Sequence, residues 1–314
     1  MKIVFLSDFL PTPQNIGGGL HNQIARWAQA LHDQGEEIWV ICKSNNIKYN
    51  QYPFPVIEIQ FTGNEIKIYQ FAQKLTFHKI DYTLEQVFYA WALARECKKI
   101  PGVNIIQSSN YQYMGIFIKS NHARLIVLAA SYRPIWLKTM GASNTLDNKL
   151  TCYFEKRLFK RAKAIFASSM HLATILEREV GRSVDVLPTP LPGNEVDENP
   201  DWYKQNLDGR KYMLYFGDMI KRKGIFILAH ALNEVWKTTP DVYLVMAGPD
   251  KVVSGSSMIT DFFETIKPNE DKILYAGKLD HPALFPVIKN AWFVVLPSIE
   301  DNCPNTMLEA MSLG

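Results

Sequence analysis

Acidic residues near the end of the chain are placed where they could hold a sugar or a ribose. Glu300, Asp301 and Glu309 surround an expected strand end and helix start in the segment LPSIEDNCPNTMLEAMSLG. Carboxylates there can accept hydrogen bonds from sugar hydroxyls, while the free amides at the helix start hold a phosphate. Asn305 or Thr306 is expected to cap this helix. Taken alone, the acids fit solvated or capping positions.

Three consecutive cations stand just before another expected helix. Lys221, Arg222 and Lys223 follow an expected strand in YFGDMIKRKG and precede a helix expected from Ile225 to Lys237. The helix dipole and the side-chain charges would act together on a diphosphate. A solvated basic turn is the alternative, but the position after a strand favours phosphate binding.

Three consecutive glycines lie between the first expected strand and the first expected helix. Gly17, Gly18 and Gly19, in NIGGGL, would let backbone N–H groups approach a ligand closely. The run does not follow G-x-G-x-x-G, which disfavours a dinucleotide-dependent dehydrogenase. A flexible turn is the alternative. His21 follows two residues after the run and is expected on the first turn of the helix.

Short β-branched runs alternate with helical patterns over the first part of the chain, which predicts a parallel sheet covered by helices. The clearest helix carries one apolar stripe formed by Leu20, Ile24, Trp27, Ala28 and Leu31. The expected strands are Ile3–Leu6, Glu37–Cys42, Val56–Ile59, Asn104–Gln107, Leu125–Ala130, Ala164–Ala167 and Val184–Leu187.

A proline-rich and acidic segment, PTPLPGNEVDENP at residues 188–200, interrupts this pattern. The length of 314 residues favours two domains, and we place them at residues 1–190 and 191–314. A second α/β series follows, with expected strands Tyr212–Phe216, Val242–Ala247, Ile273–Ala276 and Phe293–Leu296. Because a doubly wound sheet commonly has about five or six strands, the C-terminal domain is expected to be truncated.

Composition limits the class of protein. Thirty-four basic and 31 acidic residues leave a net charge of +3, which argues against a nucleic-acid partner. The four cysteines are scattered and the seven histidines show no ligand spacing, so we expect no metal site and a reducing, cytoplasmic location. No run approaches the roughly 18 to 20 apolar residues of a membrane-spanning helix.

One amphipathic stretch is rich in cations and is expected to be either a solvated helix face or a peripheral contact with anionic lipid at the inner face of the membrane. Its apolar residues are Phe154, Leu158 and Phe159. Its cations are Lys149, Lys156, Arg157, Lys160, Arg161 and Lys163.

The motifs, taken in order, resemble those of the retaining glycosyltransferase family 4, also called glycosyl transferases group 1. Residues 2–42 resemble that family's strand, glycine-rich loop and helix, and YFGDMIKRKG resembles its diphosphate-binding loop. VYLVMAGPD is similar to its next strand, and AWFVVLPSIEDNCPNTMLEAMSLG is similar to its donor signature of two acids. The resemblance implies an α/β fold of two Rossmann-like domains facing a cleft, the GT-B architecture.

The resemblance also implies roles for individual residues. Lys223 matches the lysine that binds the donor diphosphate, and Glu309 matches the acid that holds the ribose. Asp301 matches the first acid of the signature, usually glutamate, which contacts the sugar; Lys223 and Asp301 are therefore the catalytic candidates. The backbone at Asn305 and Thr306 matches the stretch near the distal phosphate.

Gly18 and Gly19 match the loop near the donor phosphate and the acceptor. Two positions depart from the family's pattern. Asp218 stands where an arginine is frequent, so Lys221 or Arg222 is expected to compensate. Many members have a histidine after the strand that corresponds to Leu125–Ala130, whereas this chain reads AASYRP, where Ser131 or Tyr132 could supply a hydrogen bond.

The implied reaction is transfer of a sugar from a nucleotide diphosphate sugar, with retention at the anomeric carbon, to a glycan, a lipid-linked intermediate or a small molecule. No cofactor or metal is expected, because the chain has no D-x-D motif and cations are available for the phosphates. The alternative is a catalytically silent nucleotide-sugar or glycan-binding remnant of the same fold. An isomerase or phosphorylase on this architecture is a third possibility.

Overall fold

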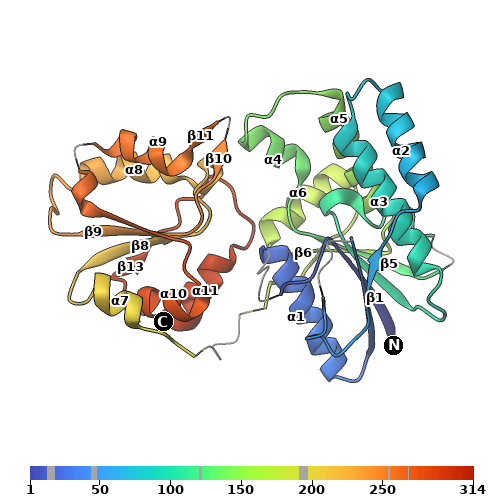
Figure 1. Cartoon of the computed structure of the whole chain (residues 1–314), viewed down its shortest axis with the longest axis horizontal. Helices are drawn as coiled ribbons and strands as arrows, with labels where there is room; N and C mark the ends of the chain where they lie inside the picture. Colours follow the sequence, from blue (N-terminus) through green and yellow to red (C-terminus); the bar gives the residue numbers. More distant parts are fainter. Residues whose placement is uncertain (13–17, 44–47, 120–121, 191–196, 254, 268) are drawn as a thin grey trace. The chain divides into compact units, whose positions relative to one another are not determined.

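The chain folds into two compact units, Met1–Thr189 and Pro190–Gly314. The structure is a computed structural model that describes residues 1–12, 18–43, 48–119, 122–190, 197–253, 255–267 and 269–314 (Figure 1). Each unit contains its own parallel sheet with helices on both faces. No helix among these residues is long and apolar enough to cross a membrane.

The N-terminal unit is built on a seven-stranded sheet in the order β3-β2-β1-β4-β5-β6-β7, with every neighbouring pair parallel. All seven runs predicted as strands in this part of the chain lie in it. The strands are β1 Lys2–Ser7, β2 Glu37–Lys43, β3 Val56–Ile59, β4 Ile105–Ser109, β5 Arg124–Ala129, β6 Ala164–Ala167 and β7 Asp185–Val186.

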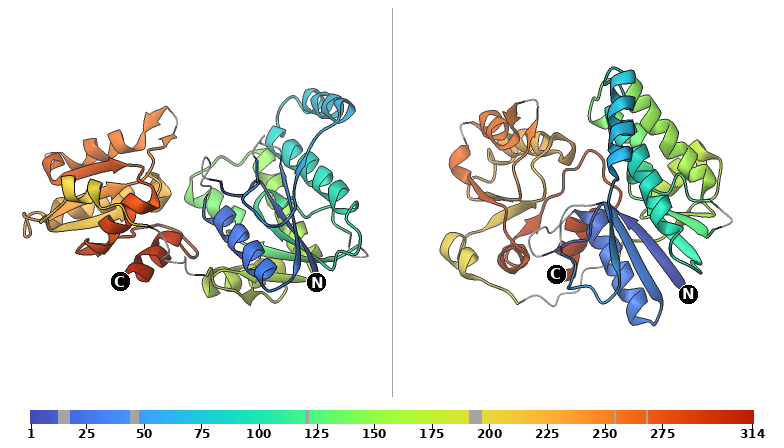
Figure 2. Two further views of the ribbon diagram at one scale, coloured as in Figure 1. Left: turned by 60° about the horizontal axis from the view of Figure 1, so that its bottom comes forward. Right: turned by 45° about the vertical axis from the view of Figure 1, so that its right-hand side comes forward.

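Alternate residues of β1 pack into two different cores, because successive side chains of a strand point to opposite faces of the sheet. Val4 and Leu6 belong to the core under α3 and α5, whereas Ile3 and Phe5 pack with Ile24 of α1. Figure 2 shows these helices around the sheet. The helices of this unit are α1 Gly19–Asp33, α2 Gly63–Leu75, α3 Asp81–Cys97, the 3₁₀ turn η1 Tyr111–Tyr113, α4 Arg133–Thr139, α5 Leu146–Arg161 and α6 Met170–Val180.

The C-terminal unit repeats this plan on a parallel sheet in the order β12-β9-β8-β13. Met213 and Tyr215 of β8 face one core, and Tyr212, Leu214 and Phe216 face the other. Its strands are β8 Tyr212–Phe216, β9 Tyr243–Ala247, β12 Ile273–Gly277 and β13 Phe293–Val294, with a small hairpin β10 Val252–Val253 and β11 Ser256–Ser257. Its helices are α7 Asp201–Asn206, η2 Lys221–Lys223, α8 Ile225–Val235, α9 Met258–Ile266, η3 Glu270–Lys272, α10 His281–Lys289 and α11 Asn305–Leu313.

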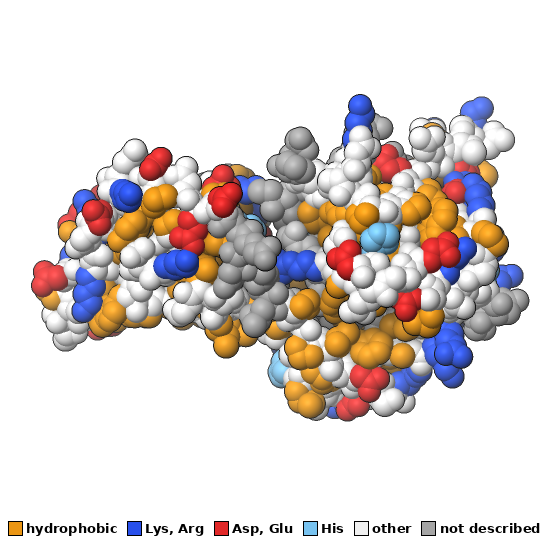
Figure 3. All heavy atoms as spheres, turned by 90° about the horizontal axis from the view of Figure 1, so that it is seen from below, with side chains coloured by type: hydrophobic (Ala, Val, Ile, Leu, Met, Phe, Trp, Pro, Cys, Tyr) orange, Lys and Arg blue, Asp and Glu red, His pale blue; other side chains and the backbone are white. Residues whose placement is uncertain are grey.

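Both sheets reverse their strand order at one place. In the N-terminal sheet the reversal lies between β1 and β4, and in the C-terminal sheet between β8 and β13. Open α/β sheets bind ligands at such a switch point, outside the carboxyl ends of the strands. The loops that follow β1, β4, β8 and β13 are therefore where a site is expected. On the face drawn in Figure 3, charged side chains of both signs are interspersed over the two units.

Candidate functional site

Glycines form the carboxyl edge of the C-terminal sheet. Gly217 and Gly248 directly follow β8 and β9, Gly277 ends β12, and all three have positive φ. The Gly217 N–H donates to Ala247 O at 2.9 Å, and the Gly248 N–H donates to Gly277 O at 2.7 Å. A Cβ on Gly248 would lie 1.9 Å from Gly217 O, so this position requires glycine.

The loop after β8 packs against the segment that follows β13. A Cβ on Gly224, whose φ is +75°, would lie 1.8 Å from Pro297 O. The Ile299 N–H donates to Arg222 O at 3.0 Å, and the Arg222 guanidinium donates to Glu300 O at 2.9 Å. These contacts place the cationic loop and the acidic segment side by side at the switch point of the sheet.

Lys223 and Asp301 form an ion pair and hydrogen bond at this place. Their side chains are 19% and 20% exposed, so both charges are partly shielded from water and still open to a ligand. The second oxygen of Asp301 accepts a hydrogen bond from the Asn302 N–H at 3.1 Å. The two residues singled out as catalytic candidates from the sequence are thus direct neighbours, although 78 positions separate them.

Helix α11 begins beside the same loop. The side chain of Thr306 in its first turn approaches Gly217, where an added Cβ would lie 3.7 Å from the Thr306 methyl. The expectation that Asn305 or Thr306 caps this helix is wrong: Pro304 is the N-cap, with no side-chain cap bond, and Asn305 is the first helical residue. Because the early amides of a helix have no intrahelical acceptor, this end can receive an anion.

Glu309 lies one turn further along α11, with its side chain 13% exposed and its carboxylate 3.9 Å from His281 Nε2 of α10. Asp218 lies on the other side of the loop, about half exposed, with its carboxylate 3.6 Å from Lys251 Nζ. The buried Tyr215 hydroxyl donates to Asp218 O at 2.8 Å, and burial raises the pKa of Tyr215.

Gly18 and Gly19 lie in the N-terminal unit, at the start of α1. Gly18 is the N-cap and Gly19 the first helical residue, while Gly17 falls outside the described residues. The Gly18 N–H donates to His21 Nδ1 at 3.2 Å, and the His21 ring stacks on Phe9 with 4.1 Å between ring centroids. His21 is therefore held in place by local contacts and is not freely exposed.

A buried lysine at the carboxyl edge of the N-terminal sheet was missed by the sequence reasoning. Lys43 ends β2, is 8% exposed, and its ammonium lies 3.2 Å from Asp8, the residue after β1. It donates to Gln86 at 2.7 Å and to Gln112 at 2.5 Å, and it lies 4.2 Å from the Tyr89 ring centroid. Burial lowers the pKa of Lys43, and the charge of Asp8 opposes that effect. A lysine directly after a buried strand was the only signal in the sequence.

The loop that carries Ser131 is held by a buried acid. Glu155 of α5 accepts from the Asn110 side chain at 2.6 Å and from the Arg133 N–H at 3.0 Å, and Asn110 also donates to Ser131 O at 2.7 Å. Burial raises the pKa of Glu155 to about 7, against the lowering effect of its hydrogen bonds. Glu155 and Asn110 therefore fix the backbone from Ser131 to Arg133. This is the loop in which the sequence departs from the histidine expected from the resemblance.

Within the part of the chain that the structure describes, no three or more His, Cys, Asp or Glu side chains cluster so that they could hold a metal ion. The cationic and amide groups described above suit phosphate oxygens instead.

Comparison with solved structures gives the class of fold. Sucrose-phosphate synthase from Thermosynechococcus elongatus matches with a TM-score of 0.71 at 17% identity, over 100% of this chain and 79% of that one. The E. coli trehalose-6-phosphate protein bound with UDP-2-fluoro glucose matches with a TM-score of 0.68 at 11% identity, over 100% and 82%. WaaG, a glycosyltransferase involved in lipopolysaccharide biosynthesis, matches with a TM-score of 0.67 at 14% identity, over 99% and 79%.

The chain thus has a GT-B-like α/β fold with two parallel sheets. Within that class, residues 210–314 match the family model described as Glycosyl transferases group 1, and this part of the chain is a domain of that family. None of the curated proteins matches the sequence. The family domain contains every candidate residue of the loop after β8 and of the segment after β13.

Proposed function

We propose that the chain is a retaining glycosyltransferase that moves a sugar from a nucleotide diphosphate sugar to a glycan, a lipid-linked or a small-molecule acceptor. The observation that carries the proposal is the Lys223–Asp301 pair beside the glycine edge of a glycosyl transferases group 1 domain. Glycine lets a diphosphate approach the backbone, and the cation opposes its charge.

We assign the groups as follows. Lys223 and Arg222 stabilise the diphosphate as the bond to the anomeric carbon breaks and its electron pair passes to the leaving oxygen. Asp301 orients the sugar, the amides at Asn305 and Thr306 hold the distal phosphate, and Glu309 binds the ribose hydroxyls. The acceptor oxygen forms the new bond to the anomeric carbon, and its proton passes to an oxygen of the leaving diphosphate. The backbone at Gly18 and Gly19, at the start of α1, is assigned to contacts with the donor phosphate and the acceptor.

No metal enters this proposal, because Lys223, Arg222 and the start of α11 supply positive charge or positive dipole ends to the phosphates. Transfer that persists in a chelator supports this part of the proposal, and loss of transfer that Mg²⁺ or Mn²⁺ restores contradicts it. The four cysteines are free thiols in the structure, which suits the cytoplasmic location we propose.

Calorimetric titration of the full chain with UDP, GDP and ADP tests the donor site. We expect saturable binding of one nucleotide, weakened about 10- to 100-fold in Lys223→Ala because a charge-assisted contact is lost. Glu309→Ala should weaken binding of the same nucleotide but leave binding of inorganic diphosphate unchanged. Lys237→Ala is the matched control, since Lys237 is exposed and pairs only with Glu234 of its own turn among the described residues. Equal affinities in all four proteins would contradict the assignment.

The second candidate, a silent nucleotide-sugar or glycan binder, is favoured by Asp218 in the phosphate loop and by Ser131 at the histidine position. Incubation with labelled donor sugars and glycan acceptors separates the two. Transfer or donor hydrolysis that Asp301→Ala abolishes supports the enzyme. Nucleotide binding without either reaction supports the binder. Turnover that requires inorganic phosphate would instead indicate a phosphorylase.

A further inference from the structure

Helix α2 presents a row of apolar side chains to the surface. Ile68, Phe71 and Leu75 are 59%, 68% and 69% exposed, and their spacing places them on one side of the helix. Phe77, two residues after the helix ends, is 80% exposed. We call these four residues the α2 patch.

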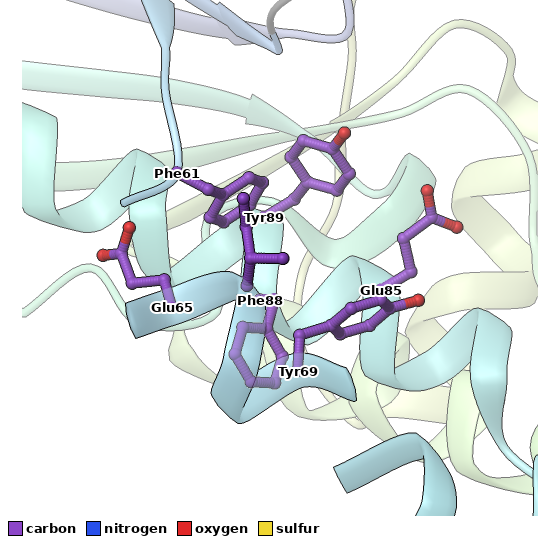
Figure 4. A pocket seen from close by; sticks show the side chains of 7 residues that line it. Phe61, Glu65, Tyr69, Glu85, Phe88 and Tyr89 are labelled. Atoms are coloured by element: carbon purple, nitrogen blue, oxygen red, sulfur yellow. The ribbon is translucent and has the colours of Figure 1, made fainter. Parts of the chain in front are cut away.

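The adjacent side of α2 packs against α3. The Tyr69 ring meets the Phe88 ring edge to face at 5.2 Å, and Figure 4 shows both rings in the pocket between the two helices. Glu65 is buried in an ion pair with Arg95. The α2 patch is therefore a second apolar face, and no described element covers it.

The apolar surface continues from the α2 patch across α3. Ile68, Phe88, Trp91 and Phe117 line a hollow of about 270 Å³. Trp91 and Phe117 are 45% and 38% exposed. The pocket in Figure 4, of about 180 Å³, adjoins this hollow through Phe88. An apolar face of this extent on a surface marks an interaction site.

Cations lie at both ends of this face, while Glu65 and the exposed Glu85 line its pockets toward α3. Residues 66–80 contain Lys67, Lys74 and Lys79 and no Asp or Glu. All three lysines are exposed, and Lys67 and Lys74, seven residues apart, run alongside the patch. At the other end, Phe117 shares a hollow with Lys98 and Lys119, which are also exposed.

The chain keeps Phe77 at the surface in an unfavourable backbone conformation. Phe77 and His78 have φ values of 50° and 58°, a left-handed region that a bulky side chain seldom occupies. His78 is paired with Asp81 at 2.7 Å, at the start of α3. The turn thus holds an aromatic ring outward, beyond the end of α2.

We propose that the α2 patch docks the protein onto an anionic lipid bilayer. The four apolar side chains enter the interface between headgroups and acyl chains, and the lysines beside them bind lipid phosphates. A second copy of the chain is a poorer occupant, because a symmetric contact would bring the lysines of both copies together. An apolar face with cations at its ends instead complements a surface that is anionic above and apolar below.

Burial of its apolar side chains argues against α5 as the membrane contact. Leu158 and Phe159 are both fully buried in the N-terminal core, so the apolar side of that cation-rich stretch faces inward. Arg157 and Lys160 are exposed beside it and form a solvated face. The proposal does not rest on the proposed glycosyl transfer, since vesicle binding is measured without donor or acceptor.

Sedimentation of the full chain with phosphatidylcholine vesicles, with and without phosphatidylglycerol, tests the proposal. We expect binding to the mixed vesicles that falls with added salt. Phe71→Ser/Leu75→Ser should lower it about tenfold or more, because two inserted side chains are lost. Lys67→Ala/Lys74→Ala should lower binding to the anionic vesicles severalfold.

Matched controls use equally exposed residues elsewhere. Tyr153→Ser and Ile227→Ser replace side chains that are 56% and 55% exposed, and Arg157→Ala/Lys160→Ala removes two cations of α5. Full binding by these variants supports the proposal. Unchanged binding by Phe71→Ser/Leu75→Ser, or loss of binding only in the α5 variant, would overturn it. A dimer that this same patch variant converts to a monomer, without vesicle binding by the parent, would assign the patch to a second copy.

Discussion

The carboxyl edges of the two sheets occupy the same place in two similar folds, yet they are built from different parts of the chain. The C-terminal edge is made of backbone: Gly217, Gly248 and Gly277 stand at the ends of three strands, and at Gly248 the backbones approach so closely that no side chain fits. The N-terminal edge is filled by side chains, with the buried Lys43 paired with the partly buried Asp8.

The two edges therefore differ in what their charged groups can do. At the C-terminal edge, charge comes from partly exposed groups around an open backbone surface, where a diphosphate can replace existing contacts. At the N-terminal edge, Lys43 and Glu155 are buried and already hydrogen-bonded to neighbouring side chains, so these groups fix loops in place. The first arrangement suits binding and the second suits positioning.

The largest expected effect is the loss of Lys43. Lys43→Ala leaves the partly buried Asp8 without its lysine and leaves Gln86 and Gln112 without their donor, so we expect the free energy of unfolding of the N-terminal unit to fall by about 3–5 kcal/mol. Hydrogen exchange of β1 and β2 in the full chain measures this. Lys99→Ala, which removes an exposed cation beside Glu96, should cost about 0.5 kcal/mol or less. Similar losses in the two variants would show that Lys43 has no special structural role.

The backbone edge should be sensitive to a single methyl group. Gly248→Ala places a Cβ against Gly217 O in a left-handed conformation, and we expect a loss of about 3 kcal/mol or more in the C-terminal unit. Gly209→Ala is the control, because its φ is also positive but no heavy atom lies within 4 Å of the added Cβ. Gly209→Ala should lower the free energy of unfolding by about 1–2 kcal/mol. Hydrogen exchange of β8 and β9 compares them, and equal losses would refute the close-packing argument.

Glu155 gives the N-terminal edge a dependence on pH. Its pKa is about 7 in the folded chain against 4.5 ordinarily, so between these values the unfolded chain loses a proton that the folded chain keeps. Stability therefore falls as pH rises through this window, by about 3 kcal/mol from this group. Unfolding of Glu155→Gln at pH 5 and pH 8 should show a weaker decline than the parent. Parallel curves would contradict the assignment.

The smallest effect concerns Asp218, the acid beside the proposed diphosphate site. Asp218→Asn removes a negative charge that is about half exposed, and we expect nucleotide diphosphate affinity to rise about threefold at low salt. Asp208→Asn is the control, since Asp208 precedes β8 at the other end of that strand. Calorimetric titration measures both. An unchanged or weaker affinity in Asp218→Asn would place the diphosphate elsewhere.

Local patterns predicted the fold because strands and helices depend on neighbouring residues. The run Ile3–Leu6 and the stripe containing Ile24 and Ala28 both lie where the sequence indicated. Strand β13 is shorter than the predicted Phe293–Leu296, since only Phe293 and Val294 pair with β8 as a strand.

The charged groups at the N-terminal edge could not be predicted in the same way. Lys43 meets Gln86 and Gln112 across 43 and 69 positions, and nothing in the local sequence announces those contacts. The exposure of Phe71 and Leu75 could not be predicted from the sequence either, because it depends on which side of α2 packs against α3. For the donor site, the order of the motifs indicated candidates, and their roles stay predictions.

In the proposed function, the ion pair between Lys223 and Asp301 also sets what an arriving donor must do. In the structure each charge neutralises the other, so neither is left uncompensated. A diphosphate that takes Lys223 would release Asp301, and the freed carboxylate would then need a donor of its own. A sugar hydroxyl on the same molecule can supply it. The pair would thereby favour an intact nucleotide sugar over a bare nucleotide, exchanging one internal contact for two contacts with a single ligand.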